Sequence, residues 1–211
     1  MRLGVVKLGG STAFDMRLKP WAEALAARSF PLIVVPGGGP FADQVRDAQR
    51  RIGFSDEAAH AMAILAMDQF GYALAELGGH FVTARTPDEI ARALECGETP
   101  VWLPSAMTIG RAGIPCSWDV TSDSLAAWLA GELHAGTLLL VKQTQDFSAE
   151  DDLGSLAGRG IVDAFLPSML PRDIDFYIAG PEDAATAHRL LSAGRLPGTR
   201  IGIPSLARTS G

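Results

Sequence analysis

Short apolar runs alternate with longer amphipathic segments along most of the chain. Seven of these runs are continuous over about three to five residues, which is typical of strands buried on both faces of a sheet. They predict strands at residues 4–8, 32–35, 81–83, 101–103, 138–141, 176–179 and 200–203. Between them, apolar residues recur at helical spacing and predict helices at residues 21–28, 41–51, 56–77, 87–94, 122–133 and 182–193. This alternation predicts an α/β fold with a mainly parallel sheet and helices on both sides.

Two stretches lack helical periodicity. Residues 103–118 contain Pro104, Gly110 and Gly113, which predicts a hairpin or loop over the active face. Residues 144–168 are similarly irregular and are a candidate cover for a bound nucleotide. We find no internal repeat and no linker, so we expect residues 1–211 to form a single domain.

Two predicted strands run directly into glycine turns. The first gives Lys7-Leu8-Gly9-Gly10-Ser11, and the second gives Pro36-Gly37-Gly38-Gly39. A loop without side chains at the carboxyl edge of a sheet presents free backbone N–H groups, and the positive end of the next helix adds to their attraction for phosphate. Either turn alone is also typical of an ordinary strand-to-helix connection, but the pair favours phosphate chemistry.

Neither turn matches a common nucleotide-binding fingerprint. A P-loop carries its lysine after the glycines, whereas Lys7 precedes them. In the second turn, Phe41 and Asp43 occupy positions where a dinucleotide fingerprint keeps its glycine spacing. A Rossmann dehydrogenase is therefore disfavoured.

A third motif, Trp118-Asp119-Val120-Thr121-Ser122-Asp123-Ser124, opens the helix predicted at residues 122–133. We expect Ser122 and Asp123 to cap this helix. The next strand ends in Lys142, at the sheet edge where ligand sites of α/β proteins form. A lone lysine there is usually solvated, but Lys7, Asp123 and Lys142 together predict two cations held by one carboxylate.

Composition narrows the class of function. The chain has 211 residues, 47% of them apolar, which is enough for one sizeable core. Its net charge of −6 argues against nucleic-acid binding, because neutralising a phosphate backbone requires clustered lysine and arginine. The two cysteines, Cys96 and Cys116, show no metal-ligand spacing, so neither a disulfide framework nor a zinc site is indicated. We expect a cytoplasmic protein without a leader or a membrane span.

These motifs resemble the amino acid kinase superfamily, which includes acetylglutamate, aspartate, uridylate and isopentenyl phosphate kinases. The resemblance rests on Lys7-Leu8-Gly9-Gly10-Ser11, Gly37-Gly38-Gly39, Thr121-Ser122-Asp123 and Pro197-Gly198-Thr199-Arg200-Ile201, in that order. It implies a three-layer αβα sandwich with an open, mainly parallel central sheet. It also implies an acceptor-binding half, residues 1–115, and a half that binds ATP, residues 116–211, with Mg²⁺ carried by ATP rather than by side chains alone.

The resemblance also implies roles for individual residues. Lys7, Asp123 and Lys142 would be catalytic, with Lys7 neutralising the transferring phosphoryl group and Asp123 orienting the lysines. The phosphate-binding residues would be Gly9, Gly10, Ser11, Gly37, Gly38 and Gly39, and the nucleotide-binding residues would be Thr121, Ser122 and Thr144.

The sequence departs from the family pattern in two places. Gln145 stands where the uridylate kinases have the second lysine of a Lys-Ala-Thr-Lys segment. The late Gly-Met-x-x-Lys motif is replaced by Gly160-Ile161-Val162-Asp163-Ala164-Phe165, which has no lysine. Another cation must replace this lysine, or none does.

Within the superfamily the chain resembles the short kinases of methanofuran-type cofactor biosynthesis, a branch of one-carbon metabolism. These kinases phosphorylate aminomethylfuranyl-methyl phosphate to its diphosphate. The resemblance lies in residues 55–69 and 118–124. In addition, Asp43 stands where isopentenyl phosphate kinases carry a histidine, and a carboxylate suits an ammonium group better than a prenyl phosphate.

Five residues are candidates for binding the acceptor. Our hypothesis is that Asp43 or Asp56 pairs with a substrate amine while Arg46 or His60 meets its phosphate, and Asp119 is a further candidate. Structural interpretations compete with these roles: Asp56 is a natural helix N-cap, Arg46 suits a solvated helix face, and a lone histidine on a helix is more often packed than a ligand.

Two other functions stay open. One is a kinase for a different acceptor, such as a carboxylate, a carbamate or a nucleoside monophosphate. The other is a non-catalytic nucleotide-binding or storage scaffold, because folds are reused for unrelated functions and the late lysine is missing. The expected partner is a small molecule, with no nucleic acid and no membrane. The apolar helix at residues 58–77 either lies in the core or faces a second subunit of a homo-oligomer.

Overall fold

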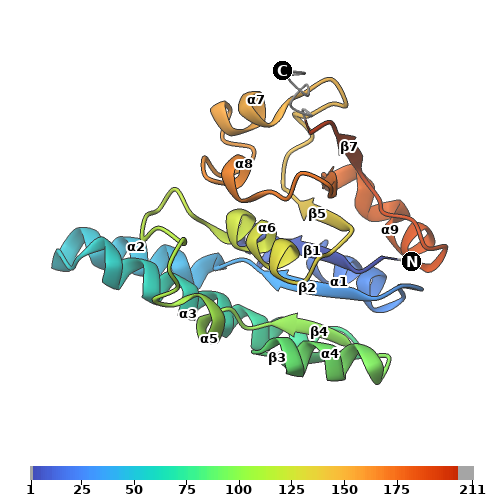
Figure 1. Cartoon of the computed structure of the whole chain (residues 1–211), viewed down its shortest axis with the longest axis horizontal. Coiled ribbons are helices and arrows are strands. Elements are labelled where there is room, and N and C mark those ends of the chain that lie inside the picture. The colour runs from blue at the N-terminus through green and yellow to red at the C-terminus, as the bar shows by residue number, and fades with distance from the viewer. Residues whose placement is uncertain (1, 204–211) are drawn as a thin grey trace, which may run out of the picture.

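A computed structural model describes residues 2–203, and the seven strands within this range form one sheet (Figure 1). The strands are β1 (Gly4–Leu8), β2 (Leu32–Pro36), β3 (Phe81–Ala84), β4 (Thr99–Trp102), β5 (Thr137–Val141), β6 (Asp175–Ala179) and β7 (Thr199–Ile201). Their order is β3-β4-β2-β1-β5-β6-β7, and all neighbours are parallel except β6 and β7. The central strand β1 places Lys7 opposite Val35 of β2 and Leu140 of β5. The predicted α/β class and the mainly parallel sheet are therefore confirmed.

Helices cover both faces of this sheet. They are α1 (Leu18–Ala26), α2 (Gly39–Ile52), α3 (Asp56–Ala75), α4 (Pro87–Glu95), α5 (Ser105–Thr108), α6 (Ser122–Glu132), α7 (Leu153–Gly158), α8 (Leu166–Met169) and α9 (Ala184–Ser192), with 3₁₀ turns at Gly10–Thr12 and Pro181–Asp183. In Figure 1, α2 to α5 lie at one end of the sheet with β3 and β4, and α7 to α9 lie at the other end with β7. The α6 helix lies over the central strands.

Two apolar cores lie on opposite faces of the sheet. Alternate residues of a strand point to opposite faces, so Val5 packs in one core with α6 and α8, while Val6 packs in the other with α1 and α9. The α3 helix contributes to both cores, through Ile64 to the first and Phe70 to the second. This arrangement confirms the predicted three-layer αβα sandwich.

The predicted elements differ from the observed ones mainly at their ends. The first helix begins at Leu18 rather than residue 21, since Pro20 is tolerated in a first helical turn. The last helix opens with a 3₁₀ turn, Pro181–Asp183, before α9. Residues 1 and 204–211 of the predicted single domain lie outside the described range. The division into halves at residue 115 stays a prediction.

The two stretches predicted to be irregular contain short helices. Residues 103–118 form a loop with one helical turn, α5, and do not form a hairpin. Residues 144–168 contain α7 and the start of α8. Helices of four to six residues are too short to show a 3.6-residue period, which is why the apolar pattern missed them.

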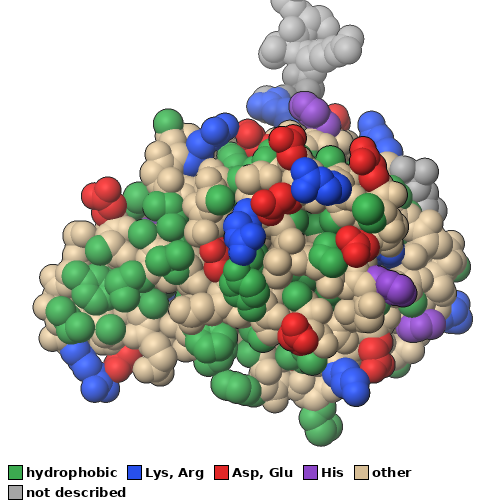
Figure 2. Space-filling model, turned by 90° about the horizontal axis from the view of Figure 1, so that it is seen from below, with side chains coloured by type: hydrophobic (Ala, Val, Ile, Leu, Met, Phe, Trp, Pro, Cys, Tyr) green, Lys and Arg blue, Asp and Glu red, His purple; other side chains and the backbone are tan. Residues whose placement is uncertain are grey.

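The α3 helix is buried on one side and exposed on the other. Ala59, Ile64 and Leu74 are buried, whereas Leu65 and Tyr72 are 47% and 50% exposed. Figure 2 shows apolar side chains gathered on the face seen from below, at the left. The predicted homo-oligomer stays a prediction, which light scattering can test.

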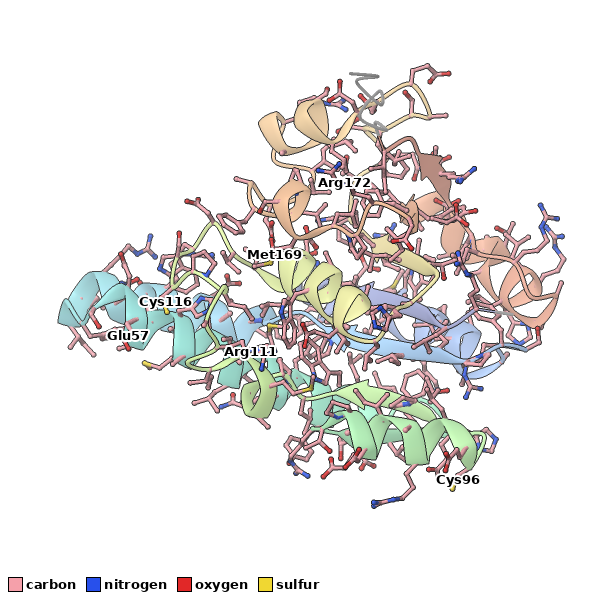
Figure 3. The ribbon with its side chains drawn as sticks, viewed as in Figure 1. Glu57, Cys96, Arg111, Cys116, Met169 and Arg172 are labelled. Atoms are coloured by element: carbon pink, nitrogen blue, oxygen red, sulfur yellow. The ribbon has the colours of Figure 1, made fainter. Side chains whose placement is uncertain are left out.

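The structure also bears on the expected absence of a membrane span and on the two cysteines. No helix within residues 2–203 is both long and apolar enough to cross a membrane. Cys96 follows α4 and Cys116 lies in the loop before α6; both are exposed free thiols, and Figure 3 shows them at opposite ends of the molecule.

Candidate active site

A buried carboxylate joins two lysines at the carboxyl edge of the sheet. Lys7 comes from β1, Lys142 follows the neighbouring parallel strand β5, and Asp123 lies in the first turn of α6. The Lys7 Nζ lies 2.8 Å from Asp123 Oδ1, and the Lys142 Nζ donates to Asp123 Oδ2. The side chain of Asp123 is only 3% exposed and that of Lys7 only 8%. The predicted grouping of two cations around one carboxylate is confirmed.

Burial and charge act in opposite directions on this cluster. Burial is the largest single effect on Asp123 and would raise the pKa of its carboxyl, but Lys7 and Lys142 together hold this pKa well below its usual range. Burial lowers the pKa of Lys142, and the charge of Asp123 opposes that shift. Asp123 is therefore ionised at neutral pH and fixes both ammonium groups in place.

The two glycine turns touch each other through their backbones. A Cβ atom on Gly10 would lie 2.1 Å from the Gly39 nitrogen, and one on Gly37 would lie 2.1 Å from the Gly10 nitrogen. Gly39 also has a φ of +53°, which favours glycine. Glycine is thus required where the turns meet, and the two predicted phosphate-binding segments form one continuous loop surface beside Lys7.

A first cavity of about 250 Å³ opens next to these turns. Its lining includes the glycines and polar or aromatic residues Gly10, Ser11, Gly38, Gly39, Asp43, Arg46, His60, Ser117, Trp118, Thr121 and Ser122, and the aliphatic residues Ala42, Ala63, Ile64, Met67, Val120 and Leu125. Three of the five candidate acceptor residues, Asp43, Arg46 and His60, are therefore brought together. The other two, Asp56 and Asp119, do not line this cavity.

An indole forms part of the wall. The Arg46 guanidinium lies over the Trp118 ring, 4.4 Å from its centroid, and also pairs with Asp43 at 3.3 Å. The Trp118 Nε1 donates to Gln49 Oε1 at 2.7 Å, and Gln49 Nε2 donates to Asp56 Oδ1 at 2.8 Å. Asp56 is thus one step removed from the cavity, and it is not the N-cap of α3 either, because Ser55 holds that position. Arg46 is partly exposed, but it is not simply a solvated residue.

The lysine pair lies in the lining of a second cavity of about 420 Å³. Its lining includes Lys7, Trp118, Asp119, Thr121, Asp123, Ala157, Lys142, Gly160, Val162, Asp163 and Ala164. Trp118 and Thr121 line both cavities, so the cavities are neighbours with the charged cluster at the second. Of the predicted nucleotide-binding residues, Thr121 lines the second cavity and Ser122 only the first. Thr144 lines neither and donates its hydroxyl to Asp146.

The comparisons with known proteins agree with this geometry. Residues 2–151 match the model of the amino acid kinase family. The chain belongs to the amino acid kinase family. It is also 31% identical over 141 residues to the [5-(aminomethyl)furan-3-yl]methyl phosphate kinase of Methanocaldococcus jannaschii, an alignment that covers 66% of this chain and only 62% of that relative. Both predicted resemblances are confirmed.

Solved structures of uridylate (UMP) kinases share the fold. The enzyme from Archaeoglobus fulgidus superposes with a TM-score of 0.65 at 20% sequence identity, and the match includes 96% of this chain and 100% of the A. fulgidus chain. The enzyme from Ureaplasma parvum has a TM-score of 0.67 at 15% sequence identity, and the match includes 96% of this chain and 99% of the U. parvum chain. The enzyme from Bacillus anthracis gives 0.67 at 18% identity, with 95% of each chain covered.

Asp163 contributes to the site of this amino acid kinase family member, although the sequence did not indicate it. Asp163 stands in the segment that lacks the late lysine, and its carboxylate accepts from the N–H groups of Thr121, Ser124 and Leu166 at 3.0, 2.9 and 2.7 Å. It also accepts from the hydroxyls of Thr121 and Ser124, and its own N–H donates to Asp123 Oδ2 at 3.3 Å. Asp163 therefore ties the start of α6 to the carboxylate that holds the lysines.

This contact corrects the predicted cap of α6. The N-cap is Thr121, and neither Ser122 nor Asp123 caps the helix. In the first turn, the Asp123 N–H donates to the Thr121 hydroxyl, whereas the Ser124 N–H donates to the Asp163 carboxylate from a segment some 40 residues later, as does the N–H of Thr121 itself. The Asp123 carboxylate does not cap the helix and instead pairs with Lys7 and Lys142. The available signal in the sequence was the aspartate in the segment Gly160–Phe165, which was noted only because that segment has no lysine.

Replacing Asp163 with alanine is expected to lower the free energy of unfolding by about 1–3 kcal/mol, the range for lost caps and unpaired buried donors. Asp163→Asn keeps one acceptor oxygen and should lose less. Urea unfolding at neutral pH measures both, with the exposed Asp173→Ala as the control. An alanine variant within about 0.5 kcal/mol of the wild type would contradict the structural role of Asp163.

Proposed function

We propose that the chain is an ATP-dependent kinase that transfers the γ-phosphoryl group to an anionic small-molecule acceptor. The observation that carries the proposal is the pair of buried lysines on Asp123, which lies beside two fused glycine turns and lines the second of two neighbouring cavities. Phosphoryl transfer is accelerated mainly by holding donor and acceptor in line and by neutralising the charge on the transferring group. The fixed ammonium groups neutralise charge, and backbone N–H groups of the glycine turns help to hold the phosphates. The Gly37 N–H is not one of these, because it donates to the Leu8 carbonyl.

The donor set of the second cavity fits ATP. Lys7 and Lys142 can neutralise phosphate oxygens there, while Asp123 keeps their ammonium groups from moving. Mg²⁺ bound to ATP supplies further neutralisation of the phosphates. Among residues 2–203, no three side chains of histidine, cysteine, aspartate or glutamate gather to hold a metal ion, so we propose that Mg²⁺ enters with ATP.

The first cavity fits the acceptor. Its lining contains residues of the glycine turns, where a reacting phosphate would sit, together with Asp43, Arg46 and His60. An acceptor that is a phosphate or carboxylate is already ionised near neutral pH, so no general base has to remove a proton.

We further propose that the acceptor is a phosphomonoester bearing an amine, converted to its diphosphate as in methanofuran-type cofactor biosynthesis. The similarity to a [5-(aminomethyl)furan-3-yl]methyl phosphate kinase supports this, as does a cavity whose lining includes apolar side chains for a flat ring and a carboxylate, Asp43, for an ammonium group. Carboxylate, carbamate and nucleoside monophosphate acceptors are the alternatives. The scaffold alternative is supported by the missing late lysine, whereas the intact lysine pair favours an enzyme.

The test is ADP release by the purified protein with Mg²⁺ATP against a panel of amine-bearing phosphates, carboxylates, carbamates and nucleoside monophosphates. We expect release with amine-bearing phosphates, and release at least about 100-fold slower from the Lys7→Ala variant. Release with another acceptor class alone would replace the proposed substrate. ATP binding without turnover on any acceptor would favour the scaffold.

Replacing Asp43 with asparagine is expected to raise the KM for an amine-bearing acceptor about tenfold or more, because a charge-assisted contact is lost. The KM for ATP should change less than about twofold, since Asp43 does not line the second cavity. Steady-state kinetics with either substrate varied gives both values. Asp47→Asn, on the same helix outside the cavity, is the control. An unchanged acceptor KM would remove Asp43 from the site.

A further inference from the structure

His60 lines the acceptor cavity and has a buried ring nitrogen without a hydrogen-bond partner in the described part of the chain. It lies on α3, is only 7% exposed, and lines the cavity that also contains Asp43 and Arg46. Its Nε2 has no hydrogen-bond partner within residues 2–203. A buried polar atom without a partner is costly in a folded protein, so such an atom in the lining of a cavity is a candidate contact for a bound molecule.

The other ring nitrogen fixes the tautomer. Burial is the larger effect and lowers the pKa of His60, while a backbone hydrogen bond with Ser117 raises it. A contact that raises the pKa of an imidazole stabilises its N–H, so the Ser117 carbonyl accepts from the ring. Because Nε2 is unpaired, the donor is Nδ1. Nε2 of the neutral ring therefore carries a lone pair and accepts hydrogen bonds.

We infer that His60 selects amine-bearing acceptors by accepting a hydrogen bond at Nε2 from the ammonium group of the substrate. Phosphate oxygens are themselves hydrogen-bond acceptors and do not fit a lone pair. His60 therefore belongs to the amine end of the substrate, with Asp43 supplying the charge and His60 the neutral acceptor. This inference rests on the proposed function and departs from our hypothesis that His60 meets the phosphate.

The two roles for His60 predict opposite responses to pH. Asp43 and Arg46, both from α2, are the other ionisable groups in the cavity lining, and they pair with each other at 3.3 Å. Protonating His60 removes its lone pair and adds a charge that repels an ammonium group. Acceptor binding should then weaken as the pH falls. If His60 met the phosphate, protonation would strengthen binding instead.

The first experiment crosses a protein variant with a substrate variant. The probes are [5-(aminomethyl)furan-3-yl]methyl phosphate and the same compound with methyl in place of aminomethyl. We expect His60→Leu to lower kcat/KM for the amine compound about 10- to 100-fold, the loss typical of a hydrogen bond to a charged group, and to lower kcat/KM for the methyl compound less than about threefold. Equal losses on both compounds would overturn the inference.

Two further variants separate this role from a structural one. His60→Gln keeps an acceptor oxygen and should recover part of the preference for the amine. His188→Gln replaces an exposed histidine on α9 and should leave both compounds unaffected. If the leucine variant does not fold, the glutamine variant and the pH profile carry the test.

The shared phosphate cancels from the ratio of the KM values for the amine and methyl compounds. This ratio should rise in the wild type only at pH values under the ordinary histidine pKa, because burial lowers the pKa of His60, and it should be flat in His60→Gln. A wild-type ratio that falls on acidification, or one that also rises in His60→Gln, would overturn the inference.

Failure of the proposed function is distinguishable from failure of the inference. No ADP release with either compound would contradict the kinase proposal for this substrate class, and calorimetric binding of the two compounds to the wild type and His60→Leu would still test His60. Turnover of both compounds with an unchanged preference in the His60 variants would overturn the role of His60 alone.

Discussion

Replacing Lys7 with alanine is expected to lower kcat about 10²- to 10³-fold, the range for removing one preorganised group that stabilises charge in a transition state. The side chain of Lys7 is 8% exposed, and Asp123 holds it beside the glycine turns. In the alanine variant, water therefore cannot readily replace the lost ammonium group in stabilising the transferring phosphoryl group. The KM for ATP should change much less than kcat, because Lys142 still contacts Asp123 at the same cavity. Steady-state ADP release, with ATP and acceptor varied in turn, measures these parameters.

Lys19→Ala is the matched control for this variant. Lys19 lies on α1 with its side chain 73% exposed, 4.0 Å from Glu23, and its loss should change kcat less than about twofold. A circular dichroism spectrum and an unfolding curve like those of the wild type would exclude misfolding of Lys7→Ala. If the folded variant kept more than about a tenth of the wild-type kcat, Lys7 would not be the residue that neutralises the transferring group.

The charged cluster could be predicted from the sequence because strand ends determine it. Lys7 and Lys142 each stand at or next to the carboxyl end of a continuous apolar run, and parallel strands bring such ends to one edge. The meeting of the two glycine turns follows from the same rule, since β1 and β2 are neighbours. These parts of the site depend on chain topology and on little else.

The rest of the site depends on side-chain packing between segments far apart in sequence. The stack of Arg46 on Trp118 joins α2 to the loop before α6, and nothing in the local pattern of either segment indicates it. The contacts of Asp163 with Thr121 and Ser124 likewise cross about 40 residues. A cap was expected near residue 122, but a helix start can be satisfied by any nearby carboxylate, so local propensity could not identify Asp163.

Replacing Asp123 with asparagine is expected to lower the free energy of unfolding at pH 7 by about 3–5 kcal/mol, the range for removing one partner of a buried ion pair. The two lysines would keep their charges in a buried cluster without a counter-charge, and asparagine has nearly the same shape as aspartate. Activity should also fall, because neither ammonium group would be held toward the second cavity. Urea denaturation gives the stability, and the ADP assay gives the activity.

A matched variant at a surface carboxylate tests whether burial or ion pairing causes the loss of stability. This carboxylate, like Asp123, pairs with two cationic side chains. Asp47 contacts Arg50 at 3.3 Å and Arg51 at 2.9 Å, but its side chain is 34% exposed and those of the two arginines are more than 70% exposed. Asp47→Asn should therefore cost less than about 1 kcal/mol. A similar loss for the two variants would mean that the energetics of the Asp123 cluster do not arise from its burial.

The cost of Asp123→Asn should also depend on pH, and the sign follows from the lowered pKa of Asp123 in the folded protein. An unfolded aspartate titrates near pH 4, so the stability from the ionised carboxylate is fully present above that pH. Below it, the unfolded state binds a proton that the folded state does not, and this stability is lost progressively. Asparagine resembles a protonated aspartate, so the free-energy difference between the two proteins should shrink as the pH falls from about 4 toward 2. A difference that stays constant over this range would show that Asp123 stabilises the fold through its shape and not through its charge.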